Sequence, residues 1–440
     1  MSQYTKQDII KMVEKEDVEF IRLQFVDLYG NLKNMAVTNS QLDKVLSNRC
    51  SFDCGAIEGF DGLIRPELLL YPDLDTFEIF PWRPQQGKVA RLICDVYTPD
   101  GKPFEGDSRY VLKKAIAKAK EMGYQIDVGP ECEFFLFDLD EAGNETTDTK
   151  EKGSYFDIGP IDSGENARRE MVLFLEDMGF EIESSFHADA PAQHEIDFKY
   201  DNALQSADNI VTFKLVVRTV ARRHGLNATF MPKPKSGVKG SGMHINISLQ
   251  KDGKNVFAGK DGVSEIGKKF IAGILKHVRG MSLITNPIVN SYKRLVPGFG
   301  APVYIGWSQY NRSPLIRVNN LGDENNRIEL RSPDAAANPY LALAVCIAAG
   351  LQGVKEAMDV PESIEEDYRN MSEEELMLSG IEVLPGNLGE AIAAFEEDEF
   401  VKDVLGEHIT QKYLQMKKRE WKEYCVYVSP WETEKYLTRI

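Results

Sequence analysis

The 440-residue sequence has little cysteine, no long hydrophobic run and no excess of positive charge. Its six cysteines are mostly far apart, and the one close pair, Cys50 and Cys54, lacks zinc-site spacing, which favours reduced thiols. The longest uncharged stretch, Ala335 to Val354, is too short beyond Pro339 to span a membrane, so we expect a buried helix there. A formal net charge of -17 repels nucleic acid and anionic membranes, so we expect neither as a partner.

Two nucleotide-binding motifs are also missing. The sequence has no GxxxxGK[ST] and no strand-GxGxxG-helix pattern, so a bound nucleotide would not be held by a P-loop or a Rossmann turn. The N-terminal segment carries charges every few residues and has no apolar core, which argues against a signal peptide and favours a cytoplasmic location. Hydrophobic residues make up 42% and charged residues 28%, an ordinary globular composition.

Local patterns predict a small N-terminal domain and a larger second one. Thr5 and Asp8 have the spacing of a helix-capping box, and Val18 to Phe25 alternates as a strand does. Further strands follow up to a turn-rich stretch, so we expect domains over residues 1–103 and 104–440. Beyond the boundary, helices ending on a glycine are expected at Arg109–Met122, Asn166–Met178 and Ile210–His224. Because the intervening strands alternate polar and apolar residues, we expect an α+β fold with a largely antiparallel sheet.

Four of the expected strands share a polar face. Glu131 and Glu133 are two residues apart, so a strand places both carboxylates on one face, roughly 7 Å apart. Glu195 and Asp197 have the same spacing. A third expected strand has His244, Asn246 and Ser248 on its polar face. A fourth has Arg327, Glu329 and Arg331. One such strand is common in antiparallel sheets, but four together indicate a built site.

Divalent cations explain such a face, because gathered carboxylates repel one another unless cations neutralise them. The structural alternative is a set of Glu–Arg pairs, which nearby arginines allow. Arginines crowd the C-terminal half of the face, at Arg294, Arg312, Arg317, Arg327 and Arg331. Guanidinium groups bind carboxylate or phosphate bidentately, so metal and arginines together indicate phosphoryl transfer.

The sequence resembles the type I glutamine synthetase family over essentially its whole length. The segments that carry the resemblance are VGPECEFFLF, QHEIDF, RRHGLNATFMPKP, GSGMH, NSYKRLVPG, NRSPLIR and NPYLALAV. The resemblance implies a β-grasp N-terminal domain, a catalytic domain with a curved sheet, and a homododecamer of two hexameric rings with active sites between neighbouring subunits. It also implies the reaction, in which ATP phosphorylates the γ-carboxylate of glutamate and an amine displaces phosphate, with Mg²⁺ or Mn²⁺ at two or three sites.

The resemblance assigns roles to individual residues. It implies that one metal, which serves ATP, is bound by Glu131, His244 and Glu329, and a second by Glu133 and Glu195. Arg294 and Arg312 match arginines at the glutamate and phosphoryl ends, Arg317 and Arg331 match those that stabilise the transferring phosphate, and Gly240 matches the glutamate-loop glycine. Arg294, Arg331 and Gly240 would contact substrate. Asp53, from the adjacent subunit, matches the aspartate that takes a proton from ammonium, which a nucleophilic amine requires.

Several family positions are altered. A glutamate of the second metal and ammonium site falls on Ala188, and the flap glutamate that closes over substrate falls on Gly300. The family's D-G-S-S loop reads Asp53-Cys54-Gly55-Ala56, the glutamate-loop asparagine is Lys239, and an arginine linked to feedback falls on Gly62. With Ala188, the second metal should bind weakly or take water in place of the carboxylate. Asp189 would replace the ligand only through a strand bulge.

These alterations favour a larger acceptor than ammonia. Each carboxylate that is removed near an ammonium ion reduces the electrostatic attraction for that ion by about 1 to 4 kcal/mol, at effective dielectric constants of 80 to 20. The vacated space would admit a substituent, with ~0.8 kcal/mol gained per buried methylene. The leading hypothesis is therefore a ligase that forms a γ-glutamyl amide, through γ-glutamyl phosphate, with a primary amine larger than ammonia. Two alternatives stay open, a true glutamine synthetase and a non-catalytic relative that acts as a regulator.

Overall fold

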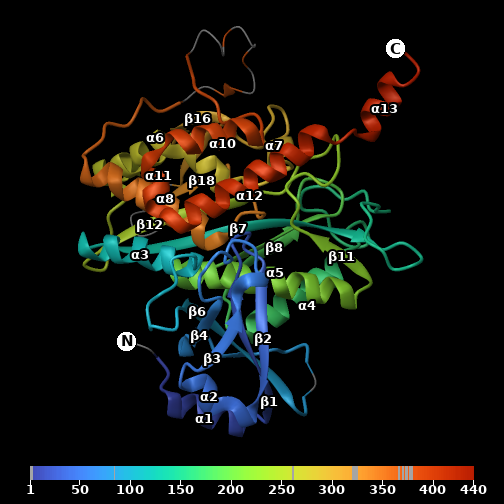
Figure 1. Cartoon of the computed structure of the whole chain (residues 1–440). Helices are drawn as coiled ribbons and strands as arrows, with labels where there is room; N and C mark the ends of the chain where they lie inside the picture. Colours follow the sequence, from blue (N-terminus) through green and yellow to red (C-terminus); the bar gives the residue numbers. More distant parts are fainter. Residues whose placement is uncertain are drawn as a thin grey trace.

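The computed structural model describes residues 3–83, 85–259, 262–319, 326–364, 367–368, 371, 375 and 380–440. Its N-terminal part forms the lower lobe in Figure 1, built around one sheet with the strand order β2-β1-β6-β4-β3 and with β5 beside β6. The elements of this part are α1 (Lys6–Lys15), β1 (Val18–Val26), β2 (Leu32–Thr38), η1 (Asn39–Gln41), α2 (Leu42–Leu46), β3 (Cys50–Asp53), η2 (Cys54–Ala56), β4 (Glu67–Pro72), η3 (Leu74–Thr76), β5 (Glu78–Ile79) and β6 (Lys88–Tyr97).

Local sequence explains how this lobe begins. Thr5 and Asp8 form the predicted capping box at the start of α1, each side chain accepting a hydrogen bond from the other residue's backbone N–H. The strand predicted from Val18 to Phe25 is confirmed as β1, in which Ile21 and Leu23 are buried. β6 ends at residue 97 and the next helix starts at 108, while the boundary between 103 and 104 stays a prediction.

The larger lobe is organised by a ten-stranded sheet with the order β16-β17-β18-β12-β7-β9-β8. β10 and β11 also pair with β7, and β13 pairs with β12. Of these pairings, β16 with β17 is parallel and the others are antiparallel, which confirms the predicted largely antiparallel sheet. Its strands are β7 (Gln125–Asp138), β8 (Ile182–His187), β9 (Gln193–Phe198), β10 (Asp201–Asn202), β11 (Leu226–Thr229), β12 (Met243–Lys251), β13 (Lys254–Asn255), β16 (Tyr304–Ser308), β17 (Pro314–Asn319) and β18 (Arg327–Leu330). A separate two-stranded sheet consists of β14 (Ala258–Gly259) and β15 (Gly262–Val263).

Helices enclose the larger sheet, and the predicted ones end on glycines with positive φ at residues 123, 179 and 225. One predicted start is wrong: the helix placed at Ile210 begins at Ala203, because the Asn202 side chain accepts from the Gln205 backbone N–H and caps an earlier turn. The helices are α3 (Ser108–Glu121), α4 (Glu165–Asp177), α5 (Ala203–Arg223), α6 (Glu265–Thr285), α7 (Ser291–Arg294), α8 (Pro339–Lys355), α10 (Leu388–Glu397), α11 (Glu399–Leu405), α12 (Glu407–Val426) and α13 (Pro430–Tyr436).

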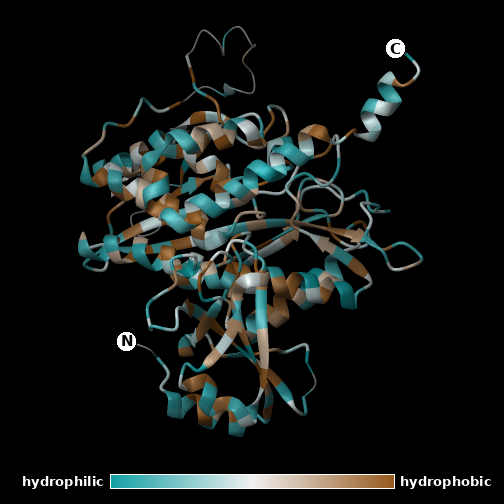
Figure 2. Cartoon of the chain, viewed as in Figure 1, coloured by the Kyte–Doolittle hydropathy of each residue, from teal (hydrophilic) through white to brown (hydrophobic). Residues whose placement is uncertain are grey.

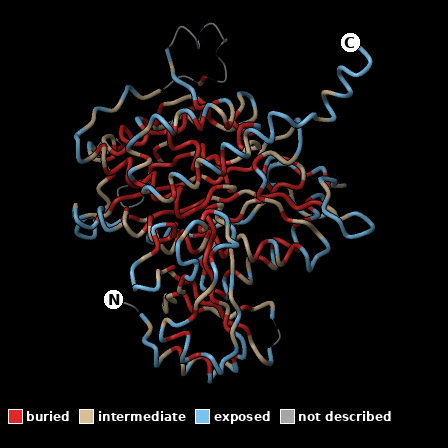
Figure 3. The backbone as a smooth tube through the Cα atoms, in the orientation of Figure 1, coloured by how far each residue is buried: buried red, intermediate tan, exposed pale blue. Residues whose placement is uncertain are grey.

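Burial follows this layering. The helix predicted to start at Pro339 is α8, which is buried along nearly its whole length and packs on α6 and α3. The outer helix α12 is largely hydrophilic in Figure 2. Figure 3 shows the buried backbone gathered in the centre of each lobe, whereas α13 projects from the body and is mostly exposed. Among the described residues, no helix combines the length and apolar character that crossing a membrane requires.

A buried arginine joins the two lobes. Arg109 on α3 is 2% exposed, and its guanidinium donates to Asp73 and Asp95 of the N-terminal lobe, at 2.8 and 2.7 Å. It also donates twice to Asp208 on α5, at 3.0 and 2.8 Å, and the Tyr340 hydroxyl donates to the same carboxylate. A buried charge with this many partners is costly to leave unpaired, so Arg109 fixes the position of the N-terminal sheet on the larger lobe.

We therefore expect Arg109→Leu to destabilise the protein strongly. The change leaves buried carboxylates without their cation, and breaking a buried ion pair costs about 3–5 kcal/mol. Thermal unfolding measures the effect as a lowered Tm. The control is Lys118→Leu, an exposed lysine on the same helix, which should leave Tm nearly unchanged. Equal Tm values for the two variants would contradict the role of Arg109.

Candidate active site

Strand register places the predicted ionic side chains in rows across one face of the larger sheet. On β7 and its neighbours, His244 lies opposite Glu131, and Glu131 lies opposite Asp197. Glu133 lies opposite Glu195 in the next row. On the other side, Glu329 pairs with Asn246 and with Arg317. Directly opposite residues share a face, so the register alone brings the four predicted polar strands together.

The first predicted metal group forms a compact cluster. Ligand atoms of Glu131, His244 and Glu329 lie within 4.8 Å of one another. His244 Nδ1 lies 2.9 Å from Glu131 Oε2 and 3.6 Å from Glu329 Oε1. Burial acts to raise the pKa of Glu131, but hydrogen bonds from His244 and Asn246 and the charge of His244 outweigh it and lower that pKa to about 2. Two carboxylates and an imidazole at this spacing fit a divalent cation.

Arginine pairing, the structural alternative to metal binding, is present at one member of the cluster. The buried Glu329 carboxylate accepts from Arg331 Nη1 at 2.5 Å and from Arg317 Nη1 at 3.3 Å. Asn319 donates to it as well, at 3.2 Å. Glu329 therefore anchors two of the predicted arginines beside the cluster. The remaining carboxylates of this face, at Glu131, Glu133 and Glu195, have no arginine within ion-pair distance among the described residues.

The second predicted group consists of Glu133 and Glu195, with Asp197 beside it. Burial, followed by the charges of Glu133 and Asp197, raises the pKa of Glu195 to about 11. Burial also raises the pKa of Asp197 to about 6. With its pKa raised this far, the Glu195 carboxyl group holds a proton at neutral pH, and a bound divalent cation would displace that proton. The donor set thus fits a cation, although it offers two ligand residues where the first group offers three.

The loop that carries Gly240 packs against the buried side chain of Arg294 beside these strands. Arg294 donates to the backbone carbonyls of Ser332 at 2.7 Å and Arg331 at 3.1 Å. A Cβ at Gly240 would lie 2.2 Å from the Pro232 carbonyl oxygen and 3.2 Å from Arg294 Cγ, so this position requires glycine. Gln193 of β9 also donates to the Gly240 carbonyl at 3.0 Å. The loop is thereby fixed against the strand that carries Glu195.

The altered positions do not restore the missing carboxylates. Ala188 is 2% exposed and follows β8 directly. Asp189 does not join the carboxylate rows, because its Oδ2 accepts from Lys239 Nζ at 2.7 Å. Gly300 has φ +85°, a conformation that side chains disfavour. Asp189 is therefore no replacement ligand, and Lys239, which sequence reasoning left without a role, has a defined partner.

A cavity of about 160 Å³ lies beside the carboxylate rows of this face. It is lined by Glu133 and His244 from the strands, and by the altered positions Lys239 and Gly300. Gly240, Arg294, Arg312 and Arg331 complete the set of predicted residues that line it. Among the residues that the structure describes, none of the N-terminal lobe lines this cavity. The predicted residues Asp53, Ala56 and Gly62 are thus not brought to it within one chain.

Within the N-terminal lobe, Asp53 and Ala56 flank the short η2 turn. The exposed Asp53 side chain caps it, with Oδ1 accepting from the Gly55 backbone N–H at 2.8 Å. Gly62 has φ +86°, and a Cβ there would lie 3.1 Å from Lys412 Nζ. Lys412 itself pairs with Asp61 at 2.9 Å. Any part that Asp53 plays at the carboxylate face must therefore come from another copy of the chain.

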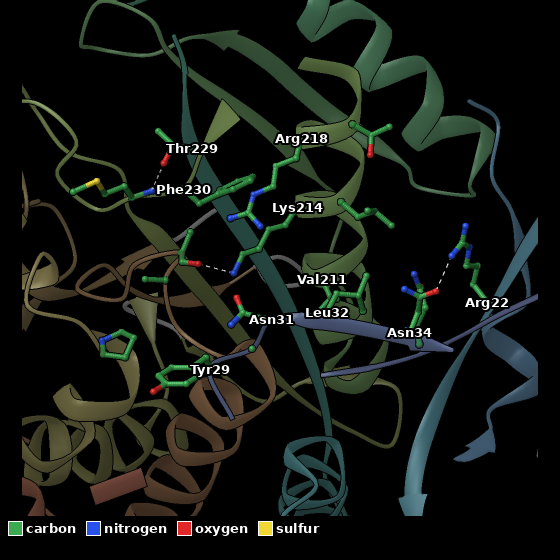
Figure 4. Close-up of a pocket in the computed structure, with 18 of the residues that line it drawn as sticks. Arg22, Tyr29, Asn31, Leu32, Asn34, Val211, Lys214, Arg218, Thr229 and Phe230 are labelled. Atoms are coloured by element: carbon green, nitrogen blue, oxygen red, sulfur yellow. Dashed lines mark hydrogen bonds between the residues drawn. The ribbon is translucent and has the colours of Figure 1, made fainter. Parts of the chain in front are cut away.

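A larger cavity, of about 1100 Å³, lies between the two lobes and away from this chemistry. Figure 4 shows Lys214 and Arg218 extending from α5 at one side of it, and the hydrogen-bonded pair Arg22 and Asn34 at another. Its lining contains none of the predicted metal ligands and no carboxylate. A cavity of this kind cannot chelate divalent cations, so size does not identify the active site here.

Sequence reasoning missed some residues of the site. Asn246 and Asn319 donate to Glu131 and Glu329, and strand alternation already placed Asn246 on the polar face. A second buried group, behind the loop that carries Ala188, was not foreseen. In it, Glu151 accepts from the Ala192 backbone N–H at 2.5 Å and lies 2.6 Å from His187 Nε2. No local pattern signals this contact, because Glu151 is distant in the sequence.

Comparisons with known proteins agree with this geometry. The family described as "Glutamine synthetase, catalytic domain" matches residues 105–436, and "Glutamine synthetase, beta-Grasp domain" matches residues 17–99. A relative named "Glutamine synthetase" from Clostridium saccharobutylicum is 55% identical, with 100% of both chains covered. One of the same name from Staphylococcus aureus strain N315 is 52% identical, covering 99% of this chain and 98% of that protein.

Solved structures show the same fold. A structure named "GmaS/ADP complex-Conformation 1" is 31% identical and superposes with a TM-score of 0.89, covering 98% of this chain and 99% of that one. The cryo-EM structure of Plasmodium falciparum glutamine synthetase is 26% identical, with a TM-score of 0.87 and 99% of both chains covered. These matches confirm the fold class, with its β-grasp and catalytic parts. They also argue against the non-catalytic alternative.

We expect Mn²⁺ binding at the Glu133 and Glu195 pair to strengthen as pH rises. At pH values below the raised pKa of Glu195, Mn²⁺ and a proton compete for the same carboxylate. The apparent affinity for Mn²⁺ should therefore increase on the order of tenfold per pH unit. Electron paramagnetic resonance of free Mn²⁺ at pH 6.5, 7.5 and 8.5 measures this. Glu195→Gln should abolish the pH-dependent site, whereas Glu183→Gln, an exposed residue on β8, should not. Binding that does not change with pH would contradict the expectation.

Proposed function

The chain belongs to the glutamine synthetase family and is an ATP-dependent ligase that forms a carbon–nitrogen bond, and from this premise we propose that it joins glutamate to a primary amine larger than ammonia. The γ-phosphoryl group of ATP passes to the γ-carboxylate of glutamate, giving γ-glutamyl phosphate and ADP. The amine nitrogen, once deprotonated, attacks the carbonyl carbon. The carbon–oxygen bond to phosphate then breaks, and inorganic phosphate leaves with the electron pair.

The residues of the carboxylate face are suited to the first step. Glu131, His244 and Glu329 would hold one divalent cation, and Glu133 with Glu195 a second, as Mg²⁺ or Mn²⁺. When bound, such cations neutralise charge on the nucleotide phosphates. Arg317 and Arg331, which Glu329 holds in place, are positioned to stabilise the transferring phosphoryl group. The protein mainly orients these groups and spreads their charge.

The remaining arginines and the glycine loop are suited to glutamate. The cavity of about 160 Å³ would hold glutamate together with the acceptor: we assign Arg294 and Gly240 to its glutamate end and Arg312 to its phosphoryl end, while Lys239 and Gly300 line its acceptor end. Arg294 donates hydrogen bonds to the backbone carbonyls of residues 331 and 332. It therefore orients Arg331 and the loop as well as facing the substrate. Residues held rigidly in this way would align the γ-carboxylate of glutamate with the γ-phosphoryl group of ATP.

Deprotonation of the acceptor is assigned to Asp53 of the partner subunit. Within one chain, the cavity lining includes no residue of the N-terminal lobe, and Asp53 is exposed there. Family members typically form oligomers, and a homododecamer of two hexameric rings, with each active site between neighbours, would supply the missing aspartate. An ammonium-type acceptor has no lone pair until a base takes its proton, so this contact is needed for the second step.

The observation that carries the choice of acceptor is the loss of two carboxylates. Ala188 and Gly300 stand where the family resemblance places glutamates that attract ammonium. Neither is restored nearby, because Asp189 is paired with Lys239 and the Gly300 backbone has φ +85°. A small cation is therefore bound weakly, while the space that the missing carboxylates leave would admit a larger amine.

A true glutamine synthetase is the second candidate. It is favoured by the relatives named "Glutamine synthetase", which are 52–55% identical over nearly the full length of this chain. In that case ammonium would be the best acceptor, and other residues would have to replace the missing carboxylates.

A phosphate-release assay with a panel of primary amines separates the two candidates. With ATP, Mg²⁺ and glutamate, we expect at least one larger amine to give a kcat/KM about tenfold or more above that of ammonium, because one lost carboxylate alone is worth about 1 to 4 kcal/mol of attraction. Mass spectrometry of the products should find the γ-glutamyl amide. Faster turnover with ammonium than with every amine in the panel would refute the proposal.

We further expect Ala188→Glu to shift the enzyme toward ammonium. The new carboxylate restores attraction for a small cation and fills space, so the ratio of kcat/KM for ammonium to that for the best amine should rise by about tenfold or more. Ala188→Gln has the same size without the charge and should raise the ratio much less. An unchanged ratio for Ala188→Glu would show that position 188 does not govern acceptor choice.

A further inference from the structure

The three altered positions of the acceptor side lie together in space. Lys239 Nζ donates to Asp189 Oδ2 at 2.7 Å, directly after the missing carboxylate at Ala188. A Cβ at Gly300, where the other carboxylate is missing, would lie 3.5 Å from Lys239 Cδ and Cε and 3.9 Å from Nζ. Asp189, Lys239 and Gly300 all line the cavity of about 160 Å³. Lys239 thus carries a positive charge into the space where family members place negative ones.

The charge balance of the acceptor side is changed accordingly. Two carboxylates and a neutral asparagine are expected from the family pattern, whereas this chain has one aspartate and one lysine that neutralise each other. A free ammonium ion entering here meets an aspartate that is already paired with Lys239, and Glu133 is the other carboxylate in the cavity lining. The alterations therefore weaken the attraction of the cavity for a small cation.

Lys239 is also available to a ligand. Its side chain is 46% exposed, and an ammonium group has three N–H donors. Within the part of the chain that the structure describes, Asp189 is its hydrogen-bond partner, which leaves donors for another acceptor group. The exposed Arg312 lines the same cavity, whereas Arg294 is buried and donates to the backbone carbonyls of residues 331 and 332. The cavity thus offers two cationic side chains to a bound molecule.

We propose that the acceptor amine carries its own carboxylate, which Lys239 binds while the amine nitrogen faces the γ-glutamyl phosphate. This inference rests on the proposed function and narrows its substrate class to amino carboxylates. The amine nitrogen loses a proton and bonds to the γ-carbonyl carbon, the carbon–oxygen bond to phosphate breaks, and phosphate leaves. The product is a γ-glutamyl amide with a second free acid group. Asp189 acts as a positioning residue that holds the Lys239 ammonium in the cavity.

Length-matched acceptors test this directly. The full-length enzyme with ATP, Mg²⁺ and glutamate is assayed for phosphate release with three sets of compounds. These are glycine, 3-aminopropanoate and 4-aminobutanoate, then methylamine, ethylamine and propylamine, and finally ethylenediamine and 1,3-diaminopropane, with ammonium as reference. We expect the best amino carboxylate to exceed its alkylamine counterpart about tenfold in kcat/KM, as one charge-assisted hydrogen bond allows. The diamines should be the poorest.

Charge variants at Lys239 connect the preference to this residue. Lys239→Asn should reduce the preference for the amino carboxylate to about twofold or less, and Lys239→Glu should reverse it in favour of the diamines. Both changes should appear in the KM for the acceptor, with the KM for ATP little altered. Lys235→Glu, an exposed lysine of the same segment that does not line the cavity, is the matched control and should keep the original preference.

The outcomes separate this inference from the proposed function. If alkylamines match or exceed the amino carboxylates while both exceed ammonium, the inference fails and the proposed function stands. If ammonium is the best acceptor, or if no amine releases phosphate, both fail. A preference for amino carboxylates that survives Lys239→Glu would refute the assignment to Lys239.

Discussion

The cross-strand register around β7 is the constraint on which the site depends. It sets Glu131 opposite both His244 and Asp197, and Glu133 opposite Glu195, on one face of a mostly antiparallel sheet. Like charges held opposite one another are unfavourable, and here they are also partly withdrawn from water. The strands can maintain this arrangement because their other faces bury Ile196, Ile245 and Phe134 in the core. Burial of the apolar face thus offsets the electrostatic repulsion between the carboxylates on the polar face.

The phosphoryl side and the acceptor side of the site differ in character. On the phosphoryl side, the expected carboxylates, the histidine and the arginines are present, and Glu329 ties two arginines to the cluster. On the acceptor side, Ala188 and Gly300 lack carboxylates, and Lys239 brings a charge of the opposite sign. In the function that we propose, the chain therefore combines the family's arrangement for activating a carboxylate with a changed surface for the amine that receives it.

Much of this could be predicted from the sequence, because period-two alternation fixes which residues share a strand face. The predicted strand Gln193–Phe198 is β9, and the polar faces of β7, β12 and β18 meet as expected. What escaped prediction depends on contacts between distant segments. The Lys239 and Asp189 pair joins two loops, and Arg109 gathers aspartates from three elements. The placement of Asp53 at the site of an adjacent subunit, which the family resemblance implies, stays a prediction.

The backbone of the loop that carries Gly300 restricts which side chains this position can accept. Gly298 and Gly300 both adopt positive φ, at 89° and 85°, so this turn is shaped around residues without side chains. A mutation that placed glutamate at 300 would meet an unfavourable backbone before its carboxylate could help. Restoring a glutamate at this position would therefore work best together with a change in the backbone of the turn, so side chain and main chain are coupled here.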